Sequence, residues 1–560
     1  MRRFSTIICC LLSCALAAQD VPSNAVAKLA TLQGIVVKEP GSEPVKKALI
    51  ELIAESQNDA GNYTALSASD GSFRIENIAP GSYRLFVERT GYQEIINHHH
   101  SQGRVIVLTA GQELKDFVIH LQAAAVIEGR VTDEDGDPMA DAQVAAFRRT
   151  FVAGHTRWEQ IGAERTNDLG EYRISALASG QYFVSATPPP DFKSLIETAG
   201  TKPQGAALPE KPANYAYQTT YYPGTRERAQ AAPIHLRPGD DFPANFSLAQ
   251  APSLTIKGSV TNLPPGASVA IMLQSRDFNV VLNGAEMRKD GSFEVRDVSP
   301  GAYTIVATVD NATPPMVARQ SLQVAENVEG VRLNPQVGGA IRGRVRIEGA
   351  TGLRTSASQI FLQLRPAEDS NDAHSDDTPI SFGLESNPAQ VNADGSFEWK
   401  DVMPGRYFVQ LTESGATADC YLKSVAAGGR EVSEAGFTAG AGVTPLDVVL
   451  DMNGAGIEGV AADAVGQPVA DAVVVAVPGP RFRGLPEHYR KASTDQSGHF
   501  RLRGLPPGDY TFFAWESIEG EAYLNSDFLR NYEGQGKALH VSEGEHVSLQ
   551  VKVIPESEAE

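Results

Sequence analysis

The chain has 560 residues, a formal net charge of −20 and 42% hydrophobic residues. This composition is typical of globular proteins and excludes a mainly disordered chain. The acidic charge argues against a nucleic-acid-binding protein, because contact with phosphates requires a basic surface. The length allows about three to five domains.

The first 18 residues have the pattern of an export signal. Two arginines precede a short apolar run, 4–16, and residues 15–17 match a small-residue cleavage site. The apolar run is too short to cross a bilayer, and no later run is long enough to do so. We therefore expect an exported protein that is periplasmic, on the outer surface or secreted. The residues around Cys14 also resemble a bacterial lipobox, so a lipid anchor at Cys14 is the alternative to a soluble product.

One pattern of turn, strand, turn and strand then recurs five times along the chain. The copies occupy residues 67–87, 166–186, 287–307, 391–411 and 494–514. In the first copy, Asp70-Gly71 predicts a tight turn, and Phe73 and Ile75 alternate with polar residues as in a half-buried strand. Pro80-Gly81 predicts the second turn, after which Tyr83 begins the next strand. The copies recur at roughly 100 residues, which is too long for a solenoid repeat and fits one small β-sandwich each.

Further strand patterns precede and follow each copy, such as 32–37 and 117–121 around the first. They bring each unit to roughly seven strands, and no long amphipathic helix is predicted. The predicted fold class is all-β, with five tandem Ig-like or prealbumin-like β-sandwich domains in an elongated array. We name the predicted domains repeat 1 (31–123), repeat 2 (124–251), repeat 3 (252–336), repeat 4 (337–452) and repeat 5 (453–555).

The combination G-x-V, G-x-P-V-x-x-A-x-V, T-D-x-x-G-x-F and L-x-P-G-x-Y resembles the carboxypeptidase regulatory-like domain. Repeat 5 matches this pattern best, in 457–477 and 494–514, whereas repeats 3 and 4 keep only its hairpin. The resemblance implies a transthyretin-like sandwich, one of the carbohydrate-binding-like folds. It also implies an accessory domain, because in metallocarboxypeptidases the zinc site lies in a separate catalytic domain, which we do not find in this sequence. The stretches 220–225 and 528–534 resemble arrays found in secreted bacterial proteins.

The sequence contains no G-x-S-x-G, H-E-x-x-H or phosphate-binding loop. We therefore predict that the protein is not an enzyme and has no cofactor or metal. The histidines 98–100 are interpreted as a polar loop, because adjacent strand residues point to opposite faces. Asp133, Asp135 and Asp137 are interpreted as a hairpin turn, since a full calcium loop of the EF-hand type would need an acid where Val144 stands.

A tyrosine-rich insert in repeat 2, residues 188–232, is the best candidate for a ligand surface. The candidate contact residues are Tyr215, Tyr217, Tyr221, Tyr222 and, outside the insert, Trp158. Aromatic faces on loops can hold sugars by stacking on their apolar ring faces. The alternative is that the tyrosines pack the insert against its own sandwich.

These observations predict a non-catalytic extracytoplasmic binding or scaffold protein with a polysaccharide or an envelope protein as partner. One alternative is a purely structural envelope spacer, which a rigid rod-like shape would favour. The other is a divergent hydrolase that uses the carboxylates of the insert. Those carboxylates are Asp191, Glu197, Glu210 and Glu227.

Overall fold

Nearly all of the regular secondary structure that the computed structural model describes is β-strand. The residues it describes are 28–55, 61–94, 103–152, 154–189, 215–275, 281–310, 312, 315–349, 359–367, 387–412, 417–440 and 444–555. Within these ranges the one α-helix is short, and no helix is long and apolar enough to cross a membrane. The predicted all-β fold class is confirmed.

Repeats 1 and 2 each place two main sheets face to face. Repeat 1 contains β1 (Ala30–Glu39), β2 (Glu43–Pro44), β3 (Leu49–Ala54), β4 (Tyr63–Leu66), β5 (Ser72–Ile78), β6 (Gly81–Glu88), β7 (Tyr92–Glu94), β8 (Arg104–Leu108) and β9 (Glu113–Ala123). Repeat 2 contains β10 (Ala125–Asp133), β11 (Gln143–Val152), β12 (His155–Arg165), β13 (Glu171–Leu177), β14 (Gly180–Thr187), β15 (Tyr215–Tyr217), β16 (Thr220–Tyr221), η1 (Arg228–Gln230), β17 (Ile234–Leu236), β18 (Asp241–Pro243), β19 (Phe246–Leu248) and β20 (Gln250–Pro252). In repeat 1 the strand orders are β2-β1-β9-β7 and β4-β3-β6-β8.

Repeats 3 and 4 have the same two-sheet plan. Repeat 3 contains β21 (Leu254–Val260), β22 (Val269–Ser275), β23 (Val281–Glu286), β24 (Ser292–Val298), β25 (Gly301–Val309), β26 (Met316–Val324), β27 (Val328–Leu333) and β28 (Gln336–Val337). Repeat 4 contains β29 (Gly339–Glu348), β30 (Phe361–Pro366), β31 (Ala389–Gln390), β32 (Ser396–Val402), β33 (Gly405–Leu411), β34 (Tyr421–Ala427), β35 (Arg430–Glu431), β36 (Phe437–Ala439) and β37 (Thr444–Asp451).

Repeat 5 carries helical turns in addition to its strands. Its elements are β38 (Ala455–Ala462), β39 (Val473–Pro478), η4 (Pro480–Phe482), η5 (Pro486–His488), β40 (Arg490–Ser493), β41 (His499–Leu505), β42 (Gly508–Trp515), η6 (Ala522–Leu524), α2 (Ser526–Arg530), β43 (Lys537–Val541) and β44 (His546–Ile554). A short parallel pairing of β42 with β44 joins its strands into one sheet.

The opening strand has the same neighbours in every repeat. In repeat 1, β1 pairs antiparallel with β5 and parallel with β9, and β38 pairs in the same way with β41 and β44. The glycine of the opening strand allows this close approach, because a Cβ on Gly34 would lie 1.8 Å from the carbonyl oxygen of Phe117 in β9. The corresponding distances to the closing strand are 2.4 Å for Gly258, 2.3 Å for Gly343 and 1.7 Å for Gly459, and in repeat 2 a Cβ on Gly129 would lie 2.0 Å from the carbonyl oxygen of Ala244, between β18 and β19.

The repeated tyrosine also has one structural role throughout. The hydroxyl of Tyr83, which is fully buried, donates to the carbonyl of Ala79 four residues earlier at 2.6 Å. The same bond is made by Tyr182 to Ala178, Tyr303 to Ser299, Tyr407 to Met403 and Tyr510 to Pro506. The recurring residues therefore fix the hairpin and leave their polar atoms satisfied inside the repeat.

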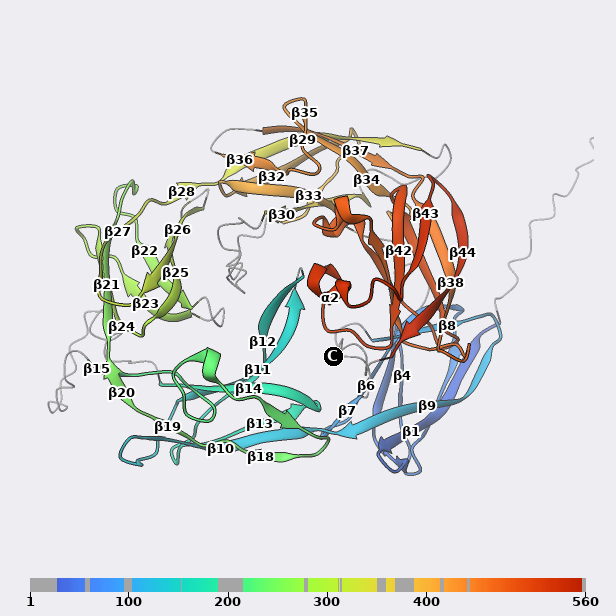
Figure 1. Ribbon diagram of the computed structural model, residues 1–560, viewed down its shortest axis with the longest axis horizontal. Helices are drawn as coiled ribbons and strands as arrows, with labels where there is room; N and C mark the ends of the chain where they lie inside the picture. Colours follow the sequence, from blue (N-terminus) through green and yellow to red (C-terminus); the bar gives the residue numbers. More distant parts are fainter. Residues whose placement is uncertain are drawn as a thin grey trace, which may run out of the picture.

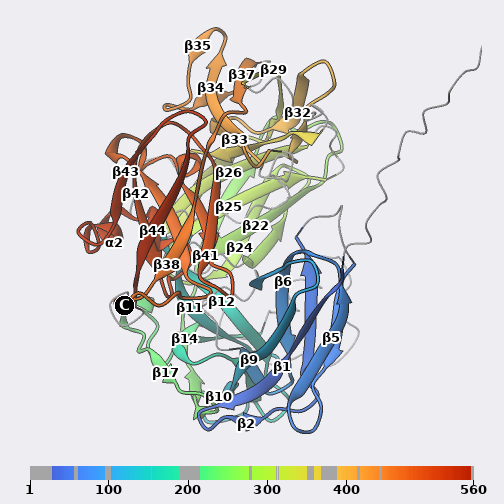
Figure 2. The ribbon, with the colours of Figure 1, turned by 90° about the vertical axis from the view of Figure 1, so that its right-hand side faces the viewer.

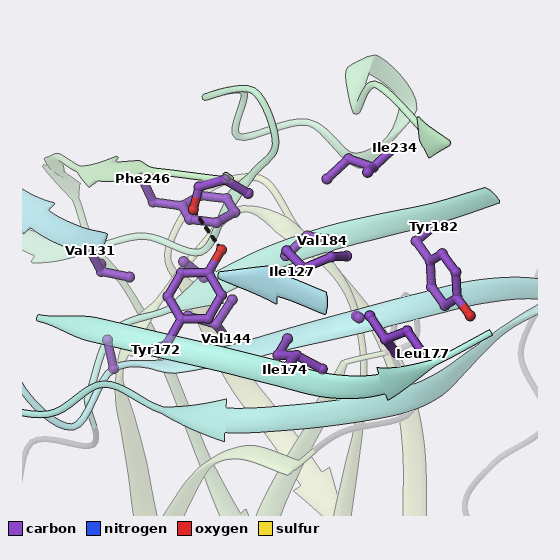
Figure 3. Close-up of a cluster of buried hydrophobic side chains, with 14 of the residues drawn as sticks. Ile127, Val131, Val144, Tyr172, Ile174, Leu177, Tyr182, Val184, Ile234 and Phe246 are labelled. Atoms are coloured by element: carbon purple, nitrogen blue, oxygen red, sulfur yellow. Dashed lines mark hydrogen bonds between the residues drawn. The ribbon is translucent and has the colours of Figure 1, made fainter. Parts of the chain in front are cut away.

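Among the described residues, each repeat has a hydrophobic cluster that lies between its strands. The members of these clusters run from Ala30 to Leu121, Ala125 to Leu248, Ile256 to Leu333, Ile341 to Leu450 and Ala455 to Val553. Figure 3 shows the second cluster, in which Val144, Ile174 and Val184 lie between the two sheets. At its edge the buried Tyr172 hydroxyl donates to the carbonyl of Ala244 at 2.6 Å. We keep the sequence-based boundaries as our proposed domain division.

The repeats do not form the elongated array that we predicted from the sequence. They follow one another around a closed ring, in which repeat 5 returns to repeats 1 and 2 (Figure 1). Viewed from the side, repeat 5 lies above repeats 1 and 2 rather than at the far end of a line (Figure 2). The cause is a set of direct contacts between residues that are far apart in the sequence, described below.

Candidate functional site

The described tyrosine-rich part of the repeat 2 insert, 215–232, packs largely against its own sandwich. Tyr221 is buried in β16, which pairs with β14, and Tyr222 places its ring against Phe242 and Phe246 at centroid distances of 5.8 and 6.5 Å. Tyr217 is partly buried against the same core, and only Tyr215 is well exposed, at 45%. The four tyrosines therefore do not form one exposed aromatic surface.

The remaining candidate residues of repeat 2 that the structure describes make packing or turn contacts within their own repeat. Trp158 in β12 is half-buried, with its ring edge-on to Phe183 in β14 at 4.0 Å. The backbone amides of Asp135 and Asp137 both donate to the carboxylate of Asp133, as in a hairpin turn. Of the carboxylates considered for a hydrolase, Glu227 accepts a bond from Gln230 at 2.6 Å. The other three, like the histidines 98–100, lie outside the described residues.

A long hairpin of repeat 2, formed by β11 and β12, reaches repeat 5 with its tip. In Figure 1 it extends to α2 in the middle of the ring. The backbone amide of Glu521 donates to the carbonyl of Phe151 at 2.9 Å, and the side-chain amide of Asn525 donates to the carbonyl of Gly154 at 2.7 Å. The Phe151 ring packs against Phe528 at 6.0 Å. Backbone and apolar contacts thus hold the hairpin tip.

In repeat 5 the hairpin tip packs against an aromatic cluster that is separate from the sandwich core. Trp515 is fully buried there, stacked on Phe513 at 5.2 Å and edge-on to Tyr532 at 5.9 Å. Much of the cluster comes from the segment after β42, including η6 and α2. The sequence of the stretch 528–534 resembles arrays in secreted proteins but gives no sign of this contact.

Repeat 5 also contacts repeat 1 through two polar side chains. The Gln496 side-chain amide donates to the Val107 carbonyl at 2.8 Å, and the Val107 amide donates to the Gln496 Oε1 at 3.1 Å. Val107 lies in β8, an edge strand, so Gln496 satisfies backbone groups that would otherwise be open. Close by, Arg104 Nε lies 2.7 Å from Asp471 Oδ2, with the two side chains 18% and 15% exposed.

A cavity of about 940 Å³ lies where repeats 1, 2 and 5 meet, and it is the candidate functional site. Repeat 1 contributes the turn between β6 and β7, repeat 2 contributes Ser175 of β13, and repeat 5 contributes Lys491 and Tyr523. Cavities of about 300–1,000 Å³ at domain junctions are common positions for ligand sites. Our sequence analysis missed it, because no local pattern brings the three repeats together.

Two carboxyl groups at this cavity are in unusual environments. Burial raises the pKa of Glu94 to about 7, although the nearby Arg104 lowers it, and the Oε1 atom of Glu94 is buried without a hydrogen-bond partner. Burial also raises the pKa of Asp471 despite its ion pair with Arg104. The described residues of the cavity therefore offer charged groups and hydrogen-bonding groups to a ligand.

A second, smaller cavity of about 560 Å³ lies between repeats 4 and 5. Its wall includes the buried thiol of Cys420, whose pKa is raised to about 11 by burial, and Arg503, which pairs with Asp419. Arg365 pairs with Glu487 across the same junction at 3.2 Å. Among the described residues no group of three or more His, Cys, Asp or Glu side chains could hold a metal ion.

In the part of the chain that the structure describes, the fold defines a protein built of small all-β sandwiches. Residues 31–122 match the family of carboxypeptidase regulatory-like domains, as expected from the resemblance of the repeat pattern. No curated protein matches the chain.

Several solved structures of bacterial proteins are similar to parts of the chain. The Bacillus anthracis TIE protein is 12% identical, with 55% of this chain and 51% of that chain covered and a TM-score of 0.17. The chain thus spans about half the length of that protein. The streptococcal ancillary pilin is 13% identical over 55% of this chain and 99% of its own, also at 0.17. The minor pilin GBS52 of Streptococcus agalactiae is 12% identical over 42% and 99%, at 0.20. We draw no functional conclusion from similarities at this level.

Proposed function

We propose that the chain is a non-catalytic, exported binding scaffold whose five repeats are held in a closed ring by repeat 5. The observation that carries this proposal is the double contact of repeat 5, with β8 of repeat 1 and with the β11–β12 hairpin of repeat 2. The family match of residues 31–122 supports a non-catalytic role, because the resemblance implies an accessory domain. A polysaccharide or an envelope protein is the partner that we propose.

The closing contacts are specific in their chemistry. A side-chain amide that both donates to and accepts from one edge-strand residue requires one register, as Gln496 does at Val107. The Arg104–Asp471 pair is largely removed from water, so a small misplacement would leave a costly unpaired charge. Contacts of this kind favour one defined closed arrangement over a mixture of loosely packed arrangements of the repeats.

The closed ring supports a binding role better than a spacer role. A spacer gains length when its repeats lie in line, and contacts between repeats 1 and 5 shorten it. Closure instead creates a cavity whose wall needs all three repeats, which an open chain would not possess. The proposed function is therefore presentation of a pocket, or of the loops around it, to an extracytoplasmic ligand.

Small-angle X-ray scattering of the full mature chain tests the closure. A compact chain of this length has a radius of gyration of about 24 Å, which is the lower bound for the ring. The double variant Phe151→Ser with Gln496→Ala should increase the radius of gyration. It removes the apolar packing of Phe151 in repeat 2 on Phe528 in repeat 5, and both hydrogen bonds between Gln496 and Val107. The control Phe361→Ser changes an exposed phenylalanine of repeat 4 and should leave the radius unchanged.

A wild-type radius more than about twice the compact value would show a line of repeats and refute the ring. A double variant as compact as wild type would show that these residues do not close it.

A further inference from the structure

The cavity between repeats 1, 2 and 5 has a wall that suits a charged, polar ligand. Arg89 and Lys491 line it, and neither forms an ion pair within the part of the chain that the structure describes. By contrast, the lining residues Arg84 and Arg173 have carboxylate partners in Glu55 and Glu128. An apolar ligand would leave the two unpaired cations without compensation, so the wall argues against one.

The Arg89 side chain gives a second indication. Its Nε atom is buried and has no hydrogen-bond partner, an arrangement that is costly for a guanidinium group. Arginine donates in a planar fork that matches a carboxylate in two-point contact. The Nε atom itself is closed to a ligand, so an anionic group in the cavity would bind the other guanidinium nitrogens of Arg89.

Neutral polar groups complete the wall on all three repeats. Thr90 and Tyr92 come from repeat 1, Ser175 from repeat 2, and Ser493 and Tyr523 from repeat 5. Hydroxyls both donate and accept hydrogen bonds, which is also the property of sugar hydroxyls. The ring of Tyr523 lies 5.9 Å from Lys491 Nζ and so holds this cation at the wall.

The acids of the wall also fit a polyhydroxylated ligand. Glu88, Glu94 and Asp471 line the cavity; Asp471 is paired with Arg104, and the Oε1 atom of Glu94 is buried without a donor. A ligand hydroxyl can donate to an accessible carboxylate oxygen of this wall, whereas a ligand that carries only acceptors cannot. The chain as a whole has a net charge of −20. The electrostatic field of the acidic chain repels anions, so an anion that binds in this cavity must be held by local contacts.

We propose that this cavity binds a short acidic oligosaccharide, with its carboxylate on Arg89 and Lys491 and its hydroxyls on the polar groups of the three repeats. The assignment rests on the proposed function, because the cavity exists only in the closed ring. It differs from the sequence-based expectation in placing the ligand away from the tyrosine-rich insert. The volume of about 940 Å³ accommodates a chain of a few sugar units.

Isothermal titration calorimetry on the full mature chain tests the proposal with trigalacturonate as probe and maltotriose as the neutral trimer. Trigalacturonate should bind at least tenfold more tightly than maltotriose, and binding should weaken as salt is raised. Arg89→Gln and Lys491→Gln should each weaken trigalacturonate binding by tenfold or more. Arg346→Gln, which changes a 72% exposed arginine of repeat 4, should leave it within twofold.

Scattering on the same samples separates the two proposals. A compact chain that does not bind trigalacturonate, or that binds both trimers equally, overturns the ligand assignment and leaves the ring intact. An extended wild-type chain overturns the ring and, with it, the cavity. Loss of binding in Arg89→Gln with an unchanged scattering curve supports direct contact, because a variant that only opened the ring would also change its radius.

Discussion

Substitution of the opening-strand glycine in repeat 5 should be severely destabilising. A Cβ on Gly459 would lie 1.7 Å from the carbonyl oxygen of Leu549, an atom of β44, which runs parallel to β38 along seven paired residues. Bringing that contact to 3.0 Å requires the strands to separate by roughly 1.3 Å. A backbone hydrogen bond of about 2.9 Å stretched by this amount is lost. We expect Gly459→Ala to destabilise repeat 5 by about 3 kcal/mol or more.

Gly484 is a matched control in the same repeat, because a Cβ there would have no atom within 4 Å. Gly484→Ala should change stability by no more than about 0.5 kcal/mol. Hydrogen exchange followed by mass spectrometry is the appropriate assay, since it reports each repeat separately in a chain that need not unfold in one step. Peptides from β38 and β44 should lose protection only in Gly459→Ala. Equal protection in the two variants would refute the argument that the glycine is required by the approach of the closing strand.

The other predictions concern titration and reactivity. Burial raises the pKa of Glu94 to about 7 from 4.5, so the closed form binds its proton more tightly than an open form, and closure should weaken as pH rises from 4.5 through 7. The loss is at most about 3 kcal/mol. Protection factors of β7 and β8 amides, which correct for the intrinsic pH dependence of exchange, should be lower at pH 8 than at pH 5 in wild type but less pH-dependent in Glu94→Gln. The same dependence in both proteins would exclude Glu94 as its source. Cys420 is buried and its pKa is raised to about 11, so iodoacetamide at pH 8 should modify it only after denaturation, as peptide mass spectrometry would show. Rapid modification of the native chain would contradict its burial.

The sequence predicted best those features that depend on residues close to one another in the chain. The turn glycines, the alternating strand residues and the tyrosine that bonds four residues back all depend on local geometry, so their pattern predicted the hairpin. One local feature was hidden: Asn77 and its counterpart Ala176 both have φ of 59°, and alanine gives no sign of that conformation. The direction of the insert tyrosines was also hidden, because strands as short as β16 have too few residues to show alternation.

The ring could not be predicted because its closing residues carry no repeated signal. Arg104 and Asp471 are 367 positions apart, and Gln496 is one amide side chain in a polar turn. A family pattern describes what the repeats share, whereas closure depends on what repeat 5 has alone, including its aromatic segment after Trp515. The candidate cavity lies between three repeats, so it can be predicted only when the arrangement of the repeats is known.

Repeats 5 and 1 belong to one covalent chain. Their contact can therefore be weaker than a contact between two separate proteins and still keep the ring closed. Tethered partners meet at an effective concentration that can reach the millimolar range, so an interface too weak to hold two separate proteins can keep a chain closed. A few polar contacts such as that of Gln496 with Val107 are then sufficient. We therefore expect the contact between repeats 1 and 5 to open and close without unfolding of either sandwich.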